Sequence, residues 1–190
     1  MILYLSIIAV CMMLISAIVT MAYNVSFWST LGITALAVVV VIIVDALIAT
    51  VCRLLPKKCA RHDGKLYTVS AKEKKFYEKL KIRAWKDWIP EIGHFTGFRK
   101  NKIDQPKNLE YLDRFLLECC YGEIGHSASV FSGFATLLFF PLTHTWEAIS
   151  IPESVVNAVL NVLPIFVLRY NAYKLEILRK SVLKKQGIAS

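Results

Sequence analysis

Charged side chains are missing from long parts of this sequence. Residues 1–44 contain no Asp, Glu, Lys or Arg, and none of the 23 Lys and Arg residues lies in residues 1–52 or 115–168. Uncharged apolar stretches of about 20 residues are long enough to cross a bilayer. With 56% hydrophobic residues, the chain is too apolar for an ordinary soluble domain, so the sequence predicts an integral membrane protein.

Motifs for disulfides, metals and nucleotides are also lacking. The five cysteines show no C-x-x-C or zinc spacing, and no P-loop, dinucleotide fingerprint or serine nucleophile elbow occurs. All cysteines but Cys11 map to the side of the membrane where thiols stay reduced. Glu-x-x-His occurs once, at Glu123 and His126, whereas carboxylate-bridged iron proteins need two such motifs. We therefore expect no disulfide framework, no metal site and no cofactor.

The apolar residues gather into stretches that predict the fold. The first stretch has no basic flank and is too long for a signal peptide, so we expect it to be retained as a span. The fold class is therefore all-α, a polytopic membrane protein forming one integral membrane domain. The four predicted transmembrane helices cover residues 2–23, 27–51, 124–145 and 151–170.

The net charge of +9 has an uneven distribution that sets the topology. Seventeen Lys and Arg residues lie between Arg53 and Arg114, and six lie between Arg169 and Lys185. Four spans place both basic segments on one side, which the positive-inside rule identifies as the cytoplasm. We expect both termini to be cytoplasmic, in a bacterial plasma membrane, with the loop around Asn24 and the loop holding Glu147 and Glu153 outside. The basic patches fit anionic lipid, and no nucleic-acid partner is expected.

The segment between the second and third spans, residues 53–117, is predicted to be a basic, helical, cytoplasmic insertion. It is too small and basic to carry a large core of its own. Ser70 and Glu73 match a capping box, which predicts a helix from Ala71 that ends at Pro90. That helix carries aromatic residues on one face and lysines elsewhere. It either lies in the membrane interface or packs on the neighbouring spans.

Asp45 is a lone carboxylate within a Val/Ile run of the second span. A charge at that depth must face protein or water, or take up a proton. Two interpretations remain open. Asp45 either pairs with a polar group of the fourth span, such as Asn157 or Asn161, or helps to line a substrate groove.

Two glutamates and a histidine mark the entrance to the third span. Glu123 and His126 have i,i+3 spacing, so on a helix they point about 60° apart, and Glu118 lies about 80° from His126. A carboxylate beside an imidazole raises its basicity and fixes its tautomer. This cluster is therefore the candidate catalytic site. The alternative is a solvated helix entrance where polar residues collect.

The stretch Glu91–Lys100 contains Gly93 and Gly97 together with polar and basic side chains. A glycine-bearing loop with paired cations suits a phosphate or sugar headgroup. The candidate substrate-binding residues here are His94, Arg99 and Lys100. An ordinary surface loop is the alternative, and Arg169, at the cytoplasmic end of the fourth span, is a further candidate for an anion.

Four short motifs, in the same order along residues 75–175, resemble the glycosyl-4,4'-diaponeurosporenoate acyltransferase family. Members of that family transfer a fatty acyl group to a sugar hydroxyl on a carotenoid glycoside. The resemblance implies O-acyl transfer and adds Trp85, Lys86, Asp87 and Asn171 as substrate-binding candidates. The motifs are Trp85-Lys86-Asp87-x-x-Pro90, Gly97-Phe98-x-Lys100, Glu118 with Glu123-x-x-His126, and Asn161-x-x-Pro164 with Arg169-Tyr170-Asn171.

The resulting hypothesis is a membrane acyltransferase that acts on a glycolipid or glycosylated isoprenoid at the cytoplasmic face. The partners are the lipid acceptor and an activated acyl donor such as acyl-CoA. His126 serves as general base, assisted by Glu123 and Glu118, while a thioester on Cys119 or Cys120 is the minority mechanism. The alternative is a non-enzymatic membrane protein that binds lipid or stabilises a complex. The sequence specifies neither the donor chain length, the acceptor, nor the oligomeric state.

Thiol labelling in intact cells tests the topology. In a background without native cysteines, we expect a membrane-impermeant maleimide to label Asn24→Cys from outside but not Lys74→Cys. Both positions should react after permeabilisation, which is the control for thiol accessibility. Labelling of Lys74→Cys alone in intact cells would contradict the assigned orientation.

Overall fold

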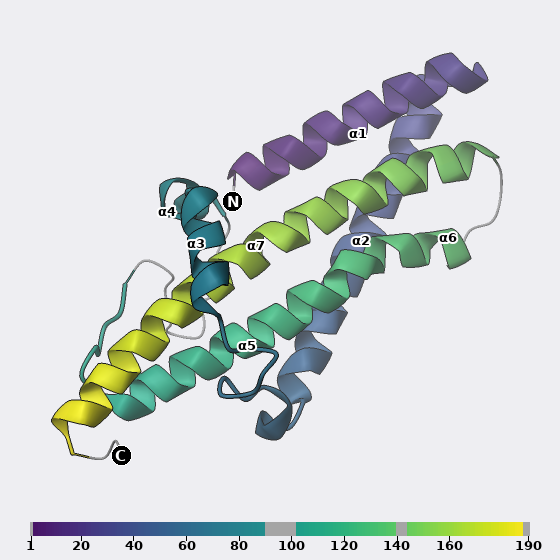
Figure 1. Cartoon of the computed structure of the whole chain (residues 1–190). Coiled ribbons are helices and arrows are strands. Elements are labelled where there is room, and N and C mark those ends of the chain that lie inside the picture. The colour runs from purple at the N-terminus through teal and green to yellow at the C-terminus, as the bar shows by residue number, and fades with distance from the viewer. Residues whose placement is uncertain (1, 90–101, 140–143, 188–190) are drawn as a thin grey trace. The chain divides into compact units, whose positions relative to one another are not determined.

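The computed structural model describes residues 2–89, 102–139 and 144–187, and this part of the chain is helical without a strand. Figure 1 shows the order of the helices along the chain. The elements are α1 (Ile2–Tyr23), α2 (Phe27–Leu54), η1 (Lys57–Cys59), α3 (Ala71–Lys79), α4 (Ile82–Trp85), η2 (Lys86–Trp88), α5 (Leu109–Ser132), η4 (Gly133–Ala135), α6 (Thr136–Phe139) and α7 (His144–Lys185).

The chain divides into two compact units. We call residues 1–51 with 125–162 the apolar unit, and residues 52–124 with 163–190 the basic unit. All 23 Lys and Arg residues fall in the basic unit. Helices α2, α5 and α7 each contribute residues to both units.

Within the described residues, three helices are long and apolar enough to cross a membrane: α1, α2 and the part of α7 from Trp146 to Lys185. They contain the predicted spans 2–23, 27–51 and 151–170. The predicted span 124–145 is different, because α5 ends at Ser132 and is followed by the short η4 and α6 helices. Among the described residues it is not one long apolar helix, and residues 140–143 lie outside them. The four-span count remains a prediction.

The helical segment of the insertion begins where the sequence predicts. The Ser70 hydroxyl accepts a hydrogen bond from the backbone N–H of Glu73, so Ser70 caps α3. The prediction of one helix up to Pro90 is wrong, because the helix breaks after Lys79. Lys81 adopts a left-handed backbone with φ 53°, and the indole N–H of Trp85 bonds the Leu80 carbonyl across the break. Pro90 itself lies outside the described residues.

The apolar unit is held by close contacts of α1 and α2 with the first half of α7. Ile15 and Val19 of α1 pack against Ile149 of α7. The hydroxyl of Tyr4 donates to the carbonyl of Leu160 at 3.2 Å. In η4, Gly133 lies so near Ser154 of α7 that an added Cβ would be 2.8 Å from the Ser154 Cα.

Glu153 lies buried in the apolar unit, in contrast to the sequence analysis, which placed Glu147 and Glu153 in an outward loop. Both residues belong to α7, which begins at His144. Glu153 is only 7% exposed, and neither carboxyl oxygen has a hydrogen-bond partner within the described part of the chain. It lines a mainly apolar cavity of about 50 Å³ between α1, α2 and α7, together with residues such as Met12, Val38, Val41 and Leu160.

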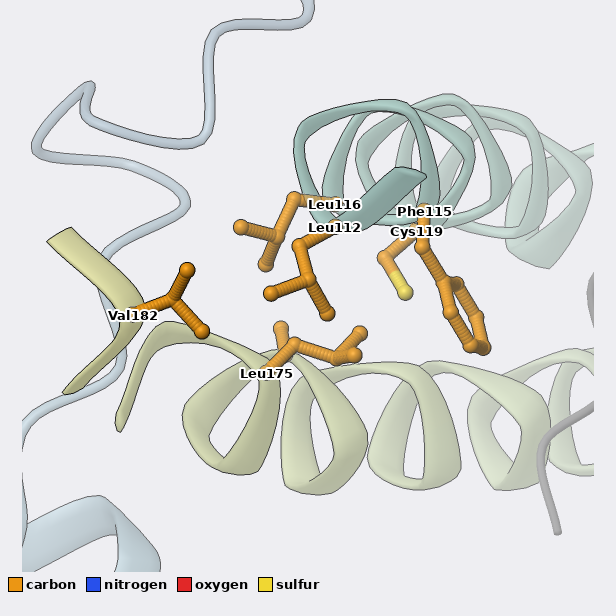
Figure 2. Close-up of a cluster of buried hydrophobic side chains, with 7 residues drawn as sticks. Leu112, Phe115, Leu116, Cys119, Leu175 and Val182 are labelled. Carbon is orange, nitrogen blue, oxygen red and sulfur yellow. The ribbon is translucent and has the colours of Figure 1, made fainter. Parts of the chain in front are cut away.

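The basic unit has a hydrophobic core built from two helices. Figure 2 shows that the side chains of Leu112, Leu116 and Cys119 on α5 point toward Leu175 and Val182 on α7. The insertion alone was predicted to be too small for a large core, and the second half of α7 supplies the other side. In addition, the Tyr77 ring of α3 lies 5.8 Å from that of Phe166 on α7. The predicted aromatic face of the insertion helix therefore packs on a neighbouring helix at this position.

The contact of Gly133 with Ser154 provides a test of packing in the apolar unit. We expect Gly133→Ala to lower the free energy of unfolding by about 1–3 kcal/mol, because the new methyl group would overlap backbone atoms of α7. Unfolding monitored by circular dichroism in detergent measures the change.

The matched control is Gly32→Ala in α2, where an added Cβ meets no atom within 4 Å among the described residues. Alanine at that helix position is expected to be neutral or to stabilise by up to about 1 kcal/mol. Equal losses in the two variants would show that η4 and α7 do not approach closely.

Candidate active site

Arg169 of α7 is the centre of the polar cluster in the basic unit. Its Nη1 donates to Glu123 of α5 at 2.8 Å and to the Leu66 carbonyl at 3.1 Å. Its Nε and Nη2 bind both carboxyl oxygens of Glu73 in α3. All three guanidinium nitrogens are thus engaged, and this bidentate geometry is the strong form of an arginine–carboxylate pair. The arginine was predicted as an anion-binding residue of the substrate site, and the anions it holds in the structure are these two carboxylates.

The two carboxylates around Arg169 lie in different environments. Burial raises the pKa of Glu123 to about 7, although Arg169 acts in the opposite direction. The hydrogen bonds from Arg169 hold the pKa of Glu73 below its usual value, since they favour the ionised form. One oxygen of Glu123 is bound by Arg169, and Oε1 is buried without a hydrogen-bond partner in the described residues.

Glu118 lies one and a half turns before Glu123 on α5 and has its own pair of cations. Its Oε2 accepts from Arg53 at 3.0 Å, and its Oε1 faces Arg114 at 2.8 Å. The side chain is 7% exposed, whereas both arginines are half exposed. The buried carboxylate of Glu118 is thus paired with two cations, one at each of its oxygens.

The neighbouring thiols are poor nucleophiles. Cys119 and Cys120 are 1% and 2% exposed. Burial raises the pKa of Cys119 well above its usual value and that of Cys120 to about 12. A thiol reacts through its thiolate, so these values disfavour a thioester intermediate at either cysteine.

His126 belongs to the apolar unit, and its hydrogen-bond partner is an amide. Its Nδ1 lies 2.9 Å from Oδ1 of Asn161 on α7. The Asn161 Nδ2 donates to Oδ2 of Asp45 on α2 at 3.2 Å, which is the pairing with residues 151–170 that the sequence left as one of two interpretations. The other carboxyl oxygen of Asp45 accepts from the hydroxyl of Ser132. Three helices therefore meet at a polar network within this unit.

Helix α5 is continuous through Gly122 and Gly125, so the helical spacing on which the candidate cluster was based is correct. The side chains that bind Glu118, Glu123 and His126 were not predicted. Glu123 and Glu118 bind arginines, and His126 binds Asn161. Sequence reasoning did not foresee that Glu73 would face Arg169. Its only signal was the capping box, which explains the position of Glu73 on α3 but not its second partner.

The other substrate-binding candidates are spread over the basic unit. His94, Arg99 and Lys100 lie outside the described residues. Trp85 and Lys86 are half-buried and Asp87 is exposed around the junction of α4 and η2. Asn171 of α7 is 8% exposed. No metal-binding group of three or more His, Cys, Asp or Glu side chains is found in the part of the chain that the structure describes.

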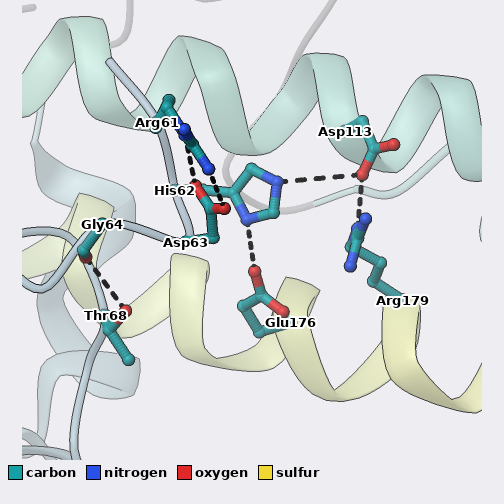
Figure 3. Close-up of polar contacts among 8 residues, drawn as sticks. All are labelled: Arg61, His62, Asp63, Gly64, Thr68, Asp113, Glu176 and Arg179. Carbon is teal, nitrogen blue, oxygen red and sulfur yellow. Dashed lines mark hydrogen bonds and ion pairs between the residues drawn. The ribbon is translucent and has the colours of Figure 1, made fainter. Parts of the chain in front are cut away.

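A second polar cluster in the basic unit was not predicted. Figure 3 shows the His62 ring between Glu176 of α7, 2.5 Å from Nδ1, and Asp113 of α5, 4.0 Å from Nε2. Asp113 also binds Arg179 of α7. The turn around Gly64 positions His62 for these contacts. The cluster fastens the start of the insertion to the same helices that form the core.

Comparison with protein families identifies the family to which most of this chain is similar. Residues 63–181 match the sequence profile of the CrtO family, described as glycosyl-4,4'-diaponeurosporenoate acyltransferase. The matched region includes Glu73, the whole of α5 and Arg169. Neither the curated proteins nor the solved structures contain a match to the chain.

Replacement of Arg169 tests the ion pairs of the basic unit. Arg169→Leu leaves the buried carboxyl of Glu123 and the partly buried carboxyl of Glu73 without a cation, so we expect a loss of about 3–5 kcal/mol in the free energy of unfolding. Arg169→Lys should lose less, because it keeps the charge but not the bidentate geometry. Thermal and denaturant unfolding in detergent measure both variants.

The control is Arg61→Leu, which removes an exposed ion pair with Asp63 whose side chains are 65% and 55% exposed. Exposed pairs contribute at most about 1 kcal/mol. Equal, small losses for Arg61→Leu and Arg169→Leu would show that Arg169 does not stabilise this unit.

Proposed function

Because this chain belongs to the glycosyl-4,4'-diaponeurosporenoate acyltransferase family, we propose that it transfers a fatty acyl group to a hydroxyl of a glycolipid or glycosylated isoprenoid at the cytoplasmic membrane face. The family match over residues 63–181 is the observation that carries this proposal. The three apolar helices support access to a lipid acceptor from within the bilayer. The acyl donor is an activated ester such as acyl-CoA.

His126 is the proposed general base of the reaction. It takes the proton from the acceptor hydroxyl while the hydroxyl oxygen bonds to the acyl carbon of the thioester. The carbon–sulfur bond then breaks, and the departing thiolate takes the proton back from the imidazolium. The half-buried position of His126, and its hydrogen bond to Asn161, support a ring that is both oriented and reachable.

Glu118 and Glu123 have arginine partners, so we assign them a supporting role in place of direct orientation of the imidazole. Glu118 of α5 holds Arg53 and Arg114 near each other, because each arginine binds one of its carboxyl oxygens. Glu123 and Glu73 hold Arg169. The group of Arg53, Arg114 and Glu118 has two cations for one carboxylate, and this excess positive charge favours the approach of a donor that carries phosphate.

Donor binding is assigned to the loop that contains His94, Arg99 and Lys100, and acceptor contacts to Trp85, Lys86, Asp87 and Asn171. Lys and Arg side chains suit the phosphates of an acyl-CoA, and glycine leaves room for close backbone approach. Transfer is direct from donor to acceptor, since both cysteines of α5 are buried and have raised pKa values.

A matched pair of histidine variants tests the general base. We expect His126→Gln to lower the rate of acyl transfer by about 10²–10⁴-fold, because glutamine can bond Asn161 but cannot take a proton at neutral pH. The His62→Gln protein, which lacks an imidazole of the basic unit, should transfer acyl groups at the rate of the wild-type protein. The assay follows radiolabelled acyl groups from acyl-CoA to a glycolipid acceptor in nanodiscs, with monodispersity checked by gel filtration.

Three outcomes would contradict this proposal. Full activity of a monodisperse His126→Gln protein would remove the histidine from the mechanism. An inactive Cys119→Ser or Cys120→Ser protein that is still folded would show that a thioester intermediate forms on the enzyme. If the wild-type protein binds glycolipid but transfers no acyl group from any thioester donor, the non-enzymatic lipid-binding alternative is correct.

A further inference from the structure

The network behind His126 fixes the orientation of the Asn161 amide. The two oxygens of Asp45 receive the Ser132 hydroxyl and the Asn161 amide N–H. The same amide nitrogen lies 3.1 Å from both the backbone carbonyl and the side-chain Oδ1 of Asn157. A backbone carbonyl can only accept, so the Asn161 atom on this side is Nδ2. The two hydrogens of Nδ2 are shared among these three acceptors.

The orientation of the amide determines the tautomer of the imidazole. With Nδ2 directed at Asp45, the atom that Asn161 presents to His126 is Oδ1, at 2.9 Å from Nδ1. A carbonyl oxygen accepts and never donates, so in the neutral ring Nδ1 carries the hydrogen. The lone pair then lies on Nε2, the nitrogen that remains to take a proton.

We propose that Asp45 and Asn161 are positioning residues that set the neutral His126 ring so that Nε2 is the basic nitrogen. We call the hydrogen-bonded series from Asp45 through Asn161 to His126 the relay. This assignment rests on the proposed function of His126. The relay resembles a carboxylate–imidazole pair with an amide inserted between the two groups. The hydrogen bonds of the structure connect Asp45 to Asn161 and Asn161 to the ring, so the orientation set by Asp45 reaches His126 through Asn161. Within the apolar unit Asp45 of α2 is the titratable group of this relay, since its other members, Asn161, Asn157 and Ser132, are neutral.

The relay predicts that the two positions can exchange their functional groups. In Asp45→Asn, an amide can offer either oxygen or nitrogen to Asn161, so the tautomer is no longer fixed. We expect kcat to fall by about 10²-fold or more with KM little changed, as a wrong tautomer costs up to about 10⁴-fold in a catalytic triad. In Asn161→Asp, two carboxylates face each other and one must bind a proton, so this variant should also be impaired.

The double variant Asp45→Asn/Asn161→Asp restores complementarity. The amide at position 45 can donate to the carboxylate at position 161, which accepts from Nδ1 of His126. We expect at least a tenfold recovery of kcat over Asp45→Asn. The acid limb of its pH–rate profile should move to higher pH than in the wild type, because a carboxylate now contacts the imidazole directly. A double variant that is no more active than Asp45→Asn, or an unshifted acid limb, would overturn the proposal.

A spectroscopic measurement separates failure of the relay from failure of the proposed function. Nitrogen-15 NMR of histidine-labelled protein in detergent, with His126→Gln used to assign the signal, reports which ring nitrogen carries hydrogen. We expect a protonated Nδ1 and an unprotonated Nε2 in the wild type, and a mixture in Asp45→Asn. The opposite tautomer in the wild type would overturn the relay whatever the activity. If His126→Gln transfers acyl groups normally while the tautomer is as expected, the general-base function is wrong and the relay stands.

Discussion

The pairing of Arg169 with two carboxylates is the interaction on which the basic unit depends. Apolar contacts hold α5 to α7, but such contacts are not directional. The guanidinium is directional, since it binds Glu73 of α3 in a bidentate manner and Glu123 of α5 with a separate nitrogen. It therefore fixes three helices in one arrangement. The cost of burying one cation and two carboxylates is offset only while all three are present.

The carboxylate of Asp45 in the apolar unit also needs partners. This unit contains no Lys or Arg, so its partly buried Asp45 has no Lys or Arg partner within the unit. Hydroxyl and amide groups of Ser132 and Asn161 take that place. Neutral donors stabilise a carboxylate less than a cation does, but they can transmit an orientation to a further residue. Carboxylates are thus stabilised by ion pairs in the basic unit and by a network of amide and hydroxyl groups in the apolar unit.

The sequence predicted those parts of the fold that depend on local signals. Apolar length identified α1, α2 and the fourth span within α7, and Ser70 marked the start of α3. The i,i+3 spacing of Glu123 and His126 was also correct, because α5 continues through two glycines. These features are set by residues close together in the chain.

What the sequence could not predict depends on residues far apart. The partners of Glu118 and Glu123 lie on other helices, and each carboxylate could have bound any of the many basic side chains of this unit. The break at Lys81 was missed because lysine carries no signal for a left-handed backbone. The choice between Asn157 and Asn161 as partner of Asp45 was open, since both lie on one face of α7 with i,i+4 spacing. The structure shows the contact with Asn161 and connects Asn157 to it.

Glu153 gives the apolar unit a built-in spectroscopic reporter. Glu153 lines an apolar cavity, and neither of its carboxyl oxygens has a hydrogen-bond partner within the described part of the chain. Its carboxyl vibration should therefore be affected less by hydrogen bonding than that of Asp45, which is bound on both oxygens. An infrared band of that kind would respond when a lipid hydroxyl or a water molecule enters the cavity, without any label being added to the protein.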